Sequence, residues 1–396
     1  MENSSFSVPG FRASAVAAGL KKDKAPDMAL FYSEKEALAA GVFTENRVKA
    51  APVLLSTEHL KSGKARAIIA NAGNANACTG REGLANARLT VDLVAKELGI
   101  KSQEVLVGST GVIGAQLNMD LVKGAIPGLV KGLSPGGIHS AAKAIMTTDS
   151  FPKLTRFEGE TGGIQYQIVG IAKGAGMIMP DMATMLCFIL TDIKIGKDEL
   201  KRALTTAVED SFNRITVDGD TSTNDSVIIL ANGEANNGPL TPDDYGIFNR
   251  GLRQVMRDLA TMIVKDGEGA TKVVYIKVKG SASQKDAGKA ARTVANSNLV
   301  KTAFYGQDPN WGRIMGALGR SEISMEEEAV SIWIDDVQIV QGGLGMGPDA
   351  EKKAADRMKG EEFFLTIDLC QGEYEYQMTT CDLTHEYVSI NADYRT

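Results

Sequence analysis

One polar residue, Thr184, stands directly before an apolar run in the stretch KGAGMIMPDMATMLCFIL, which covers residues 173–190. The run 185–190 predicts a buried strand. The threonine then has two interpretations. It is either a β-branched residue that suits the edge of a strand, or a nucleophile held at the strand's end. A threonine hydroxyl is a poor nucleophile unless a base lies beside it.

Two glycine-rich stretches could bind an anion. In GSTGVIG, residues 108–114, glycines would let backbone N–H groups converge on an anion or a developing oxyanion. The spacing matches neither the dinucleotide-binding pattern nor a phosphate-binding P-loop, so an ordinary turn between strand and helix remains an alternative. In KGAGM, Lys173 precedes a glycine turn. That lysine either binds a carboxylate or phosphate, or is simply exposed to solvent, as most lysines are.

Three polar motifs have similar pairs of interpretations. TTD, residues 147–149, is either a polar turn or a hydroxyl pair that faces a ligand. DGEGATK, residues 266–272, is either the loop that ends a helix or a site where Glu268 meets an ammonium group. DGDTSTNDS, residues 218–226, has ligands for a hard cation but lacks the EF-hand spacing. We therefore interpret it as a polar loop and predict no metal site.

The elements that would position these motifs alternate between strand and helix. Apolar runs and period-2 patterns predict strands, and amphipathic patterns predict helices. A Thr-Pro pair marks the start of the longest helix. Together they indicate a mixed α/β fold without repeats and without a domain boundary in the composition. The predicted strands are 65–70, 104–107, 164–168, 185–190, 227–231, 273–278 and 330–334, the predicted helices are 83–98, 119–133 and one from 241 to about 262, and 363–390 reads as mostly β.

Bulk composition narrows the classes of protein. A chain of 396 residues suits about two or three lobes. The net charge of −6 gives no reason to expect nucleic acid or an anionic membrane as a partner. No apolar run reaches the roughly 18–20 residues of a membrane span, and the N-terminus is not that of a secretory signal. The four cysteines form neither a disulfide framework nor a zinc pattern, so we expect reduced thiols and a cytoplasmic location.

Taken together and in order, the motifs resemble one family. The chain is similar to the glutamate N-acetyltransferases, also called ornithine acetyltransferases, of the cyclic arginine pathway. The resemblance spans almost the whole chain. The matching stretches are AGVFTENR, NAGNANACTG, GSTGVIG, AIMTTD, KGAGMIMPDMATML, DGDTSTND, DGEGATK, DPNWGR and CDLTHEYVSINADYRT.

The resemblance implies that the chain cuts itself between Ala183 and Thr184. Two chains, 1–183 and 184–396, would result, stay associated in one α/β fold and pair into an α2β2 heterotetramer. The mechanism would be that of the N-terminal-nucleophile hydrolases. The freed α-amino group of Thr184, with an ordinary pKa of about 7.7–8.0, can take the hydroxyl proton without a histidine. This is consistent with a chain that has only three histidines.

The other site residues follow from the same resemblance. Thr110 and Gly111 match the oxyanion-hole pair. The substrate-contacting positions match Thr147 (preferred here to Thr148), Lys173, Thr184, Glu268, Asn391 and Thr396. The implied reaction moves the acetyl group from N2-acetyl-L-ornithine to L-glutamate through acetyl-Thr184. It needs no metal or organic cofactor. Some family members, the bifunctional kind, also accept acetyl-CoA as donor. No motif in this sequence separates them from the monofunctional kind.

Two alternatives belong to other classes. A self-cleaving aminopeptidase or amidase would share the Thr184 chemistry but release its acyl group to water. A nucleotide- or amino-acid-binding module would use GSTGVIG and KGAGM in an uncut chain. A transferase requires an acceptor, whereas the amidase does not. A transferase also forms a covalent adduct, whereas the binding module does not. The opposite charges of Lys173 and Glu268 favour a substrate with two charged ends.

Overall fold

The computed structural model describes residues 6–179 and 185–393 of the chain. These residues form two compact units. The first unit contains residues up to 213 and residues 220–263, and the second contains residues 214–219 and 264–393. Two units agree with the expected number of lobes. Their boundaries differ from the predicted cut after residue 183, which lies within the first unit.

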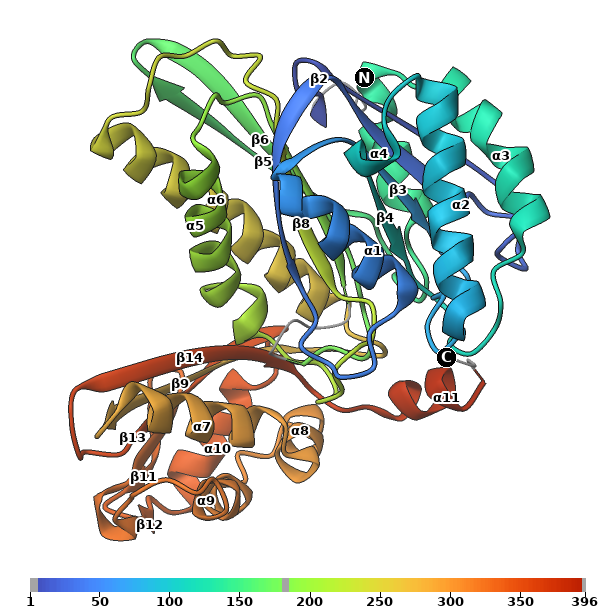
Figure 1. Cartoon of the computed structure of the whole chain (residues 1–396). Helices are drawn as coiled ribbons and strands as arrows, with labels where there is room; N and C mark the ends of the chain where they lie inside the picture. Colours follow the sequence, from blue (N-terminus) through green and yellow to red (C-terminus); the bar gives the residue numbers. More distant parts are fainter. Residues whose placement is uncertain (1–5, 180–184, 394–396) are drawn as a thin grey trace. The chain divides into compact units, whose positions relative to one another are not determined.

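An eight-stranded sheet forms the centre of the first unit (Figure 1). The strand order is β4-β3-β2-β8-β7-β6-β5, and β1 also pairs with β2. The pairs β3/β4 and β7/β8 are parallel, whereas the other neighbours are antiparallel. The strands are β1 (Phe11–Val16), β2 (Met28–Phe43), β3 (Lys64–Asn71), β4 (Val105–Ser109), β5 (Lys153–Thr161), β6 (Ile164–Lys173), β7 (Leu186–Thr191) and β8 (Ser226–Ala231).

The sheet of the first unit folds over on itself at β2, where the register shifts between Tyr32 and Ala37. Phe31 of β2 consequently packs on Phe188 of β7, with ring centroids 5.3 Å apart. A Cβ on Gly108 in β4 would also lie 3.4 Å from that phenylalanine ring. The buried apolar residues between the two halves form one continuous core. As a result, the ends of β4 and β6 come together although the two strands are not neighbours in the sheet.

Helices cover both outer faces of this folded sheet. On one side, α1, α2 and α3 share a core with β3 and β4 (Figure 1). On the other, α6 packs so closely that a Cβ on Gly170 of β6 would lie 2.6 Å from Val255. The first unit is therefore a helix/sheet/sheet/helix arrangement. Its helices are α1 (Ala51–His59), α2 (Gly80–Leu98), α3 (Met119–Lys131), α4 (Ile138–Ala144), α5 (Lys197–Glu209) and α6 (Pro242–Lys265), whose last residues belong to the second unit.

The second unit is a smaller sheet with helices on one face. The strand order is β12-β11-β10-β13-β9-β14, and α7 to α10 pack on the apolar face. The strands are β9 (Val273–Ser281), β10 (Ser331–Ile334), β11 (Val337–Gln341), β12 (Leu344–Gly345), β13 (Glu362–Asp368) and β14 (Tyr374–Cys381). The helices are α7 (Gln284–Ala295), α8 (Asn298–Tyr305), α9 (Trp311–Gly319), α10 (Pro348–Arg357) and α11 (His385–Asp393).

Most predicted elements are confirmed, and the fold class is mixed α/β as expected. The prediction that 363–390 is mostly β is wrong at its end, because residues His385–Asp393 form α11. The β-branched Val388 and Ile390 favour a strand locally, but Asn391 bonds the carbonyl of Tyr387 one helical turn back. No helix in the described part of the chain is long and apolar enough to cross a membrane.

Candidate active site

The GSTGVIG loop begins where β4 ends, and its backbone is held tightly. The Thr110 N–H donates to the Asn71 carbonyl at 2.9 Å. Gly111 follows with φ +127°, and a Cβ there would lie 2.4 Å from the Gly73 carbonyl carbon. Only glycine fits such a conformation and such a close approach. Within the described residues the Gly111 N–H donates to no acceptor, so a free donor stands beside the Thr110 hydroxyl.

Buried amides fix this loop from behind. The Asn71 side chain accepts from the Ser109 hydroxyl at 2.6 Å and donates to the Asn74 carbonyl at 2.8 Å. Asn224, from the DGDTSTND motif, donates to the carbonyls of Ala75 and Ser109 at 2.6 and 2.8 Å. These bonds join the loops after β3 and β4 to the segment before β8. That motif is thus a structural polar loop in this region, as we predicted.

Lys173, the last residue of β6, lies inside the first unit. Only 3% of its surface is exposed, so the interpretation of Lys173 as a solvent-exposed lysine is wrong. Its Nζ donates to the Thr147 hydroxyl at 2.7 Å and to the Thr110 hydroxyl at 3.4 Å. The structure thereby brings together three predicted site residues from three separate motifs. The contact favours Thr147 over Thr148, although whether either touches substrate stays a prediction.

Asp149 lies beneath this cluster. Its carboxylate accepts from the Lys153 ammonium at 2.7 Å and lies 3.7 Å from the Lys173 ammonium. It also accepts the N–H groups of Thr147 and Gly174, at 2.9 and 2.6 Å. Burial alone would raise the pKa of the Asp149 carboxyl, but the charges of Lys173 and Lys153 outweigh it and hold that pKa well below its usual value.

The predicted nucleophile Thr184, its predecessor Ala183 and the terminal Thr396 lie outside the described residues. The N–H of Met185, the residue after Thr184, donates to the Asp225 carboxyl at 3.0 Å. That carboxyl is fully buried, and burial raises its pKa well above the usual value despite this hydrogen bond. A buried carboxyl thus anchors the residue that follows Thr184 in the chain. Sequence analysis did not single out Asp225 within DGDTSTND.

Glu268 and Asn391 meet within the second unit. The Asn391 amide donates to the Glu268 carboxylate at 2.7 Å. The DGEGATK loop follows α6, as the interpretation of it as a helix-ending loop requires, and it packs on the start of α11. A Cβ on Gly269 would lie 2.7 Å from the Tyr387 nitrogen. Two motifs more than a hundred residues apart therefore form one cluster.

Side chains from the segment between β14 and α11 hold this cluster. Asp382 accepts the N–H groups of Thr271 and Lys272, at 2.8 and 3.1 Å. The Thr384 hydroxyl donates to the Gly269 carbonyl at 2.8 Å. These bonds fix the loop that carries Glu268 on both sides, so the carboxylate is presented on a constrained backbone.

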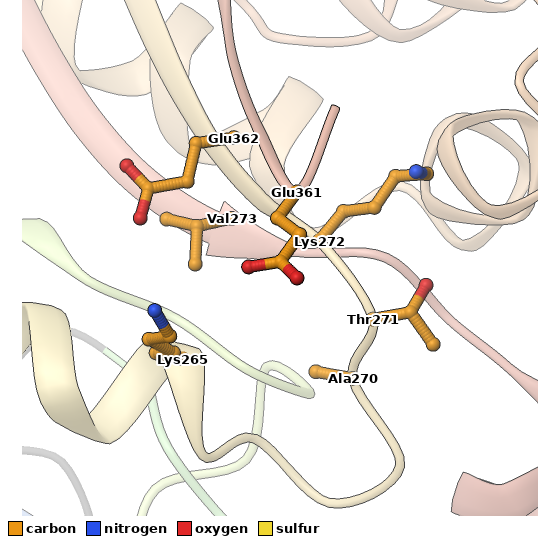
Figure 2. A pocket seen from close by; sticks show the side chains of 7 residues that line it. All are labelled: Lys265, Ala270, Thr271, Lys272, Val273, Glu361 and Glu362. Carbon is orange, nitrogen blue, oxygen red and sulfur yellow. The ribbon is translucent and has the colours of Figure 1, made fainter. Parts of the chain in front are cut away.

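The same loop borders a surface pocket of about 360 Å³ (Figure 2). Two lysines and two glutamates give it mixed charge, and neither Glu268 nor Asn391 lines it. Lys272 bonds the Gly360 carbonyl at 3.1 Å, which accounts for its position. Among the described residues, no group of three or more His, Cys, Asp or Glu side chains could hold a metal ion. The lining residues are Lys265, Ala270, Thr271, Lys272, Val273, Glu361 and Glu362.

Some supporting residues were missed by sequence analysis. Asp149 stood inside the TTD motif, and Asn71 and Asn224 stood inside quoted motifs, but no role was predicted for them. Lys153 was not singled out at all. Its pairing with Asp149 depends on the register of β5 and β6, in which Lys153 lies opposite Ala172. An aspartate four residues before a lysine is too common a pattern to reveal that pair.

The fold and the clusters define a class before any comparison. A mixed α/β protein presents the Thr110 hydroxyl and the Gly111 N–H, suited to a carbonyl oxygen, beside the buried Lys173 ammonium, which is suited to a carboxylate. Such groups are typical of an enzyme that carries out acyl chemistry on an amino acid. The ArgJ family model matches residues 12–396. The chain belongs to the ArgJ family.

Relatives and a solved structure agree with this membership. The chain is 52% identical over 393 residues to the arginine biosynthesis bifunctional protein ArgJ of Geobacter sulfurreducens, covering 99% of this chain and 100% of the relative. It is 46% identical over 399 residues to the glutamate N-acetyltransferase of Methanocaldococcus jannaschii, covering 98% and 97%. The crystal structure of the arginine biosynthesis bifunctional protein ArgJ from Bacillus halodurans matches 52% of this chain and 98% of its own, with 40% identity and a TM-score of 0.50.

Proposed function

We propose that this protein is a glutamate N-acetyltransferase that moves the acetyl group from N2-acetyl-L-ornithine to L-glutamate. The observation that carries the proposal is the convergence of Lys173, Thr147 and Thr110 in a member of the ArgJ family. A buried ammonium with two hydroxyls suits a carboxylate-bearing substrate whose acyl oxygen lies near the GSTGVIG loop.

The first half-reaction forms an acetyl-enzyme. The Thr184 hydroxyl oxygen attacks the acetyl carbonyl carbon of N2-acetylornithine, and its proton passes to the Thr184 α-amine. The Thr110 hydroxyl and the Gly111 N–H stabilise the tetrahedral oxyanion. The carbon–nitrogen bond then breaks, the departing nitrogen takes the proton, and ornithine leaves.

The second half-reaction regenerates the enzyme. The α-amine of glutamate attacks acetyl-Thr184, the ester bond breaks, and the proton returns to the threonine oxygen. N-acetylglutamate is the product. We assign Lys173 and Thr147 to the substrate carboxylate, and Glu268, with Asn391, to the side-chain ammonium of ornithine. Thr396 is the remaining proposed contact.

The nucleophile requires a cut between Ala183 and Thr184, giving chains 1–183 and 184–396. The share of the sequence matched by the Bacillus halodurans chain, 52%, suits a solved chain produced by a cut near the middle. Sheet order supports continued association, because β7 and β8 of the second chain lie between β2 and β6 of the first. We propose an α2β2 heterotetramer of about 84 kDa, twice the 42.1 kDa of one chain, which light scattering on a sizing column would measure.

Acceptor dependence tests the reaction. Purified protein is incubated with N2-acetylornithine, with and without glutamate, and ornithine, acetate and N-acetylglutamate are quantified. We expect ornithine and N-acetylglutamate in equal amounts and only when glutamate is present. Steady release of acetate without glutamate would instead identify the self-cleaving amidase. Thr184→Ala should abolish transfer, and Thr184→Ser, which keeps a hydroxyl, should retain part of it.

We further propose that acetyl-CoA serves as a second acetyl donor. The support is the bifunctional name of the relative from Geobacter sulfurreducens, at 52% identity. Incubation of the protein with acetyl-CoA and glutamate should release free CoA thiol and N-acetylglutamate together. Absence of thiol release from a preparation that transfers acetyl from acetylornithine would identify the monofunctional kind. We place the reaction in the cytoplasm, where thiols stay reduced, because Cys78, Cys187, Cys370 and Cys381 are all free.

A further inference from the structure

Asp149 accepts the backbone N–H groups of Thr147 and of the residue after Lys173, groups that the proposed substrate contacts do not use. Its Oδ2 accepts the backbone N–H of Thr147 at 2.9 Å, which leaves the Thr147 hydroxyl to Lys173. Its Oδ1 accepts the N–H of Gly174, the residue after Lys173, at 2.6 Å. One carboxylate therefore ties the end of β6 to the TTD turn.

Asp149, Lys153 and Lys173 form a buried charged cluster. Asp149 and Lys153 have no exposed side-chain surface, and the Lys173 side chain is 4% exposed. Both ammonium groups lie near the Asp149 carboxylate, at 2.7 and 3.7 Å, and the charge of Lys173 also acts on the buried Asp225 carboxyl. Lys21 lies close enough to influence the same groups electrostatically, and its Nζ bonds the carbonyls of Pro26 and Ala144. A buried ammonium group is costly unless an anion lies close to it, and Asp149 is such an anion for both lysines.

Lys153 and Lys173 contact the Asp149 carboxylate at different distances. Lys153 forms the closer ion pair, at 2.7 Å, whereas Lys173 lies 3.7 Å from the same carboxylate and directs its hydrogen bonds to threonine hydroxyls. Lys153 begins β5 opposite Ala172 of β6, so it is fixed by the sheet and not by the site. Asp149 therefore forms its closer ion pair with Lys153 and attracts Lys173 from a greater distance.

We propose that Asp149, paired with Lys153, is a positioning residue that fixes Lys173 and Thr147 for recognition of the α-carboxylate shared by acetylornithine and glutamate. This inference rests on the proposed function. Asp149 itself does not touch the substrate. Its removal takes the Asp149 carboxylate away from both buried ammonium groups and takes this acceptor away from the Thr147 N–H. Carboxylate recognition should suffer more than the acyl chemistry.

The test compares two substrates that differ only in that carboxylate. The value of kcat/KM is measured for N2-acetylornithine and for N-acetyl-1,4-diaminobutane, with glutamate as acceptor, in the wild type and in Asp149→Asn. We expect the ratio of the two values to fall about tenfold or more in the variant. A residue with a purely structural role would lower both values equally and leave the ratio unchanged. A ratio that is unchanged or increased overturns the proposal.

A second variant keeps the proposal testable if Asp149→Asn fails to fold. Lys153→Met keeps an unbranched side chain of nearly the same length but removes the ammonium group. The Asp149 carboxylate is then expected to pair with the Lys173 ammonium instead. The ratio should fall in this variant too, and an unchanged or increased ratio overturns the proposal. Loss of the proposed function itself is distinguishable, because the wild type would then transfer no acetyl group from either substrate.

Discussion

At the scale of single residues, the candidate catalytic residues of the first unit lie on closely packed backbone. Gly111 shows this most clearly. Its φ of +127° and the 2.4 Å that would separate a Cβ from the Gly73 carbonyl carbon leave room for hydrogen alone. Gly73 is packed in turn, because a Cβ there would lie 2.8 Å from the Leu20 carbonyl oxygen. The proposed oxyanion donor therefore rests on two layers of backbone.

Gly111→Ala should consequently displace the loop and remove the oxyanion donor. We expect kcat to fall by about 10²–10³-fold, the usual cost of losing one such donor. Gly114→Ala is the matched control, because Gly114 also has a positive φ, +82°, but an added Cβ would meet nothing within 4 Å. That control should lose about 1–2 kcal/mol of stability from backbone strain and keep its kcat. Equal kcat in both variants would remove Gly111 from the site.

Asp149 also predicts a dependence of stability on pH. Its folded pKa is held low by Lys173 and Lys153 against the effect of burial, whereas an unfolded aspartate has a pKa of about 3.9. The stabilisation is therefore present above about pH 4 and is lost as the pH falls through the folded pKa. In urea unfolding, the stability difference between wild type and Asp149→Asn should shrink as the pH falls from about 7 to about 3. A constant difference would mean that the carboxylate charge contributes nothing.

At the scale of elements, the meeting of strand ends creates the first cluster, and α11 creates the second. Asn391 lies in the last turns of α11 and bonds both Glu268, at 2.7 Å, and the Tyr387 carbonyl, at 3.0 Å. None of the residues of α11 is buried, although the Tyr387 hydroxyl bonds Asp218 at 3.3 Å and the His385 ring lies edge-on to Tyr305. The position of this helix in the second unit thus depends on polar bonds more than on apolar packing.

Asn391→Ala should release Glu268 and lower kcat/KM for acetylornithine by about 10- to 100-fold, the value of a hydrogen bond to a charged group. The unfolding temperature should change little, because Asn391 is exposed. Ser389→Ala is the control on the same helix, since the Ser389 hydroxyl bonds the His385 carbonyl of its own helix at 3.3 Å. If the two variants had the same kcat/KM, the proposed substrate contact at Asn391 would be wrong.

Most of the elements that local patterns predicted are confirmed, but these patterns did not predict the two features that assemble the first cluster. The strand β2 was not predicted, because its middle, with Glu34, Lys35 and Glu36, favours helix by intrinsic propensity. The turning of the sheet at β2, and hence the contact between β4 and β7, depends on tertiary packing. The burial of Lys173 was unpredictable for the same reason, since its carboxylate partner lies in another motif and its cover comes from other strands.

The site residues themselves were identified by resemblance and not by pattern. GSTGVIG and KGAGM each left two interpretations open, and only their order along the chain, with the other motifs, indicated a family. The structure then placed Thr110, Thr147 and Lys173 together. Asp149, Lys153 and Asp225 needed the structure, because nothing in a sequence states which buried carboxyl faces which strand end.

At the scale of the whole molecule, the predicted division of the chain and the compact units are different things. The boundaries between the two compact units fall at residues 213–220 and 263–264. The predicted cut lies elsewhere, between β6 and β7, which are two paired strands of one sheet. Lys173 of β6 lies opposite Leu186 of β7 in that pairing. A cut there would separate two chains that remain bonded along a shared sheet, so cleavage would expose a new N-terminus without dissociating the protein.

The intact mass of the purified, denatured protein tests the central claim most directly. From a preparation that transfers acetyl, we predict two species of about 19 and 23 kDa, obtained by dividing 42.1 kDa at Thr184, with the larger beginning TMLCF. Incubation with acetylornithine should add one acetyl group to the larger species only. A single species of 42.1 kDa from an equally active preparation would contradict an N-terminal threonine nucleophile.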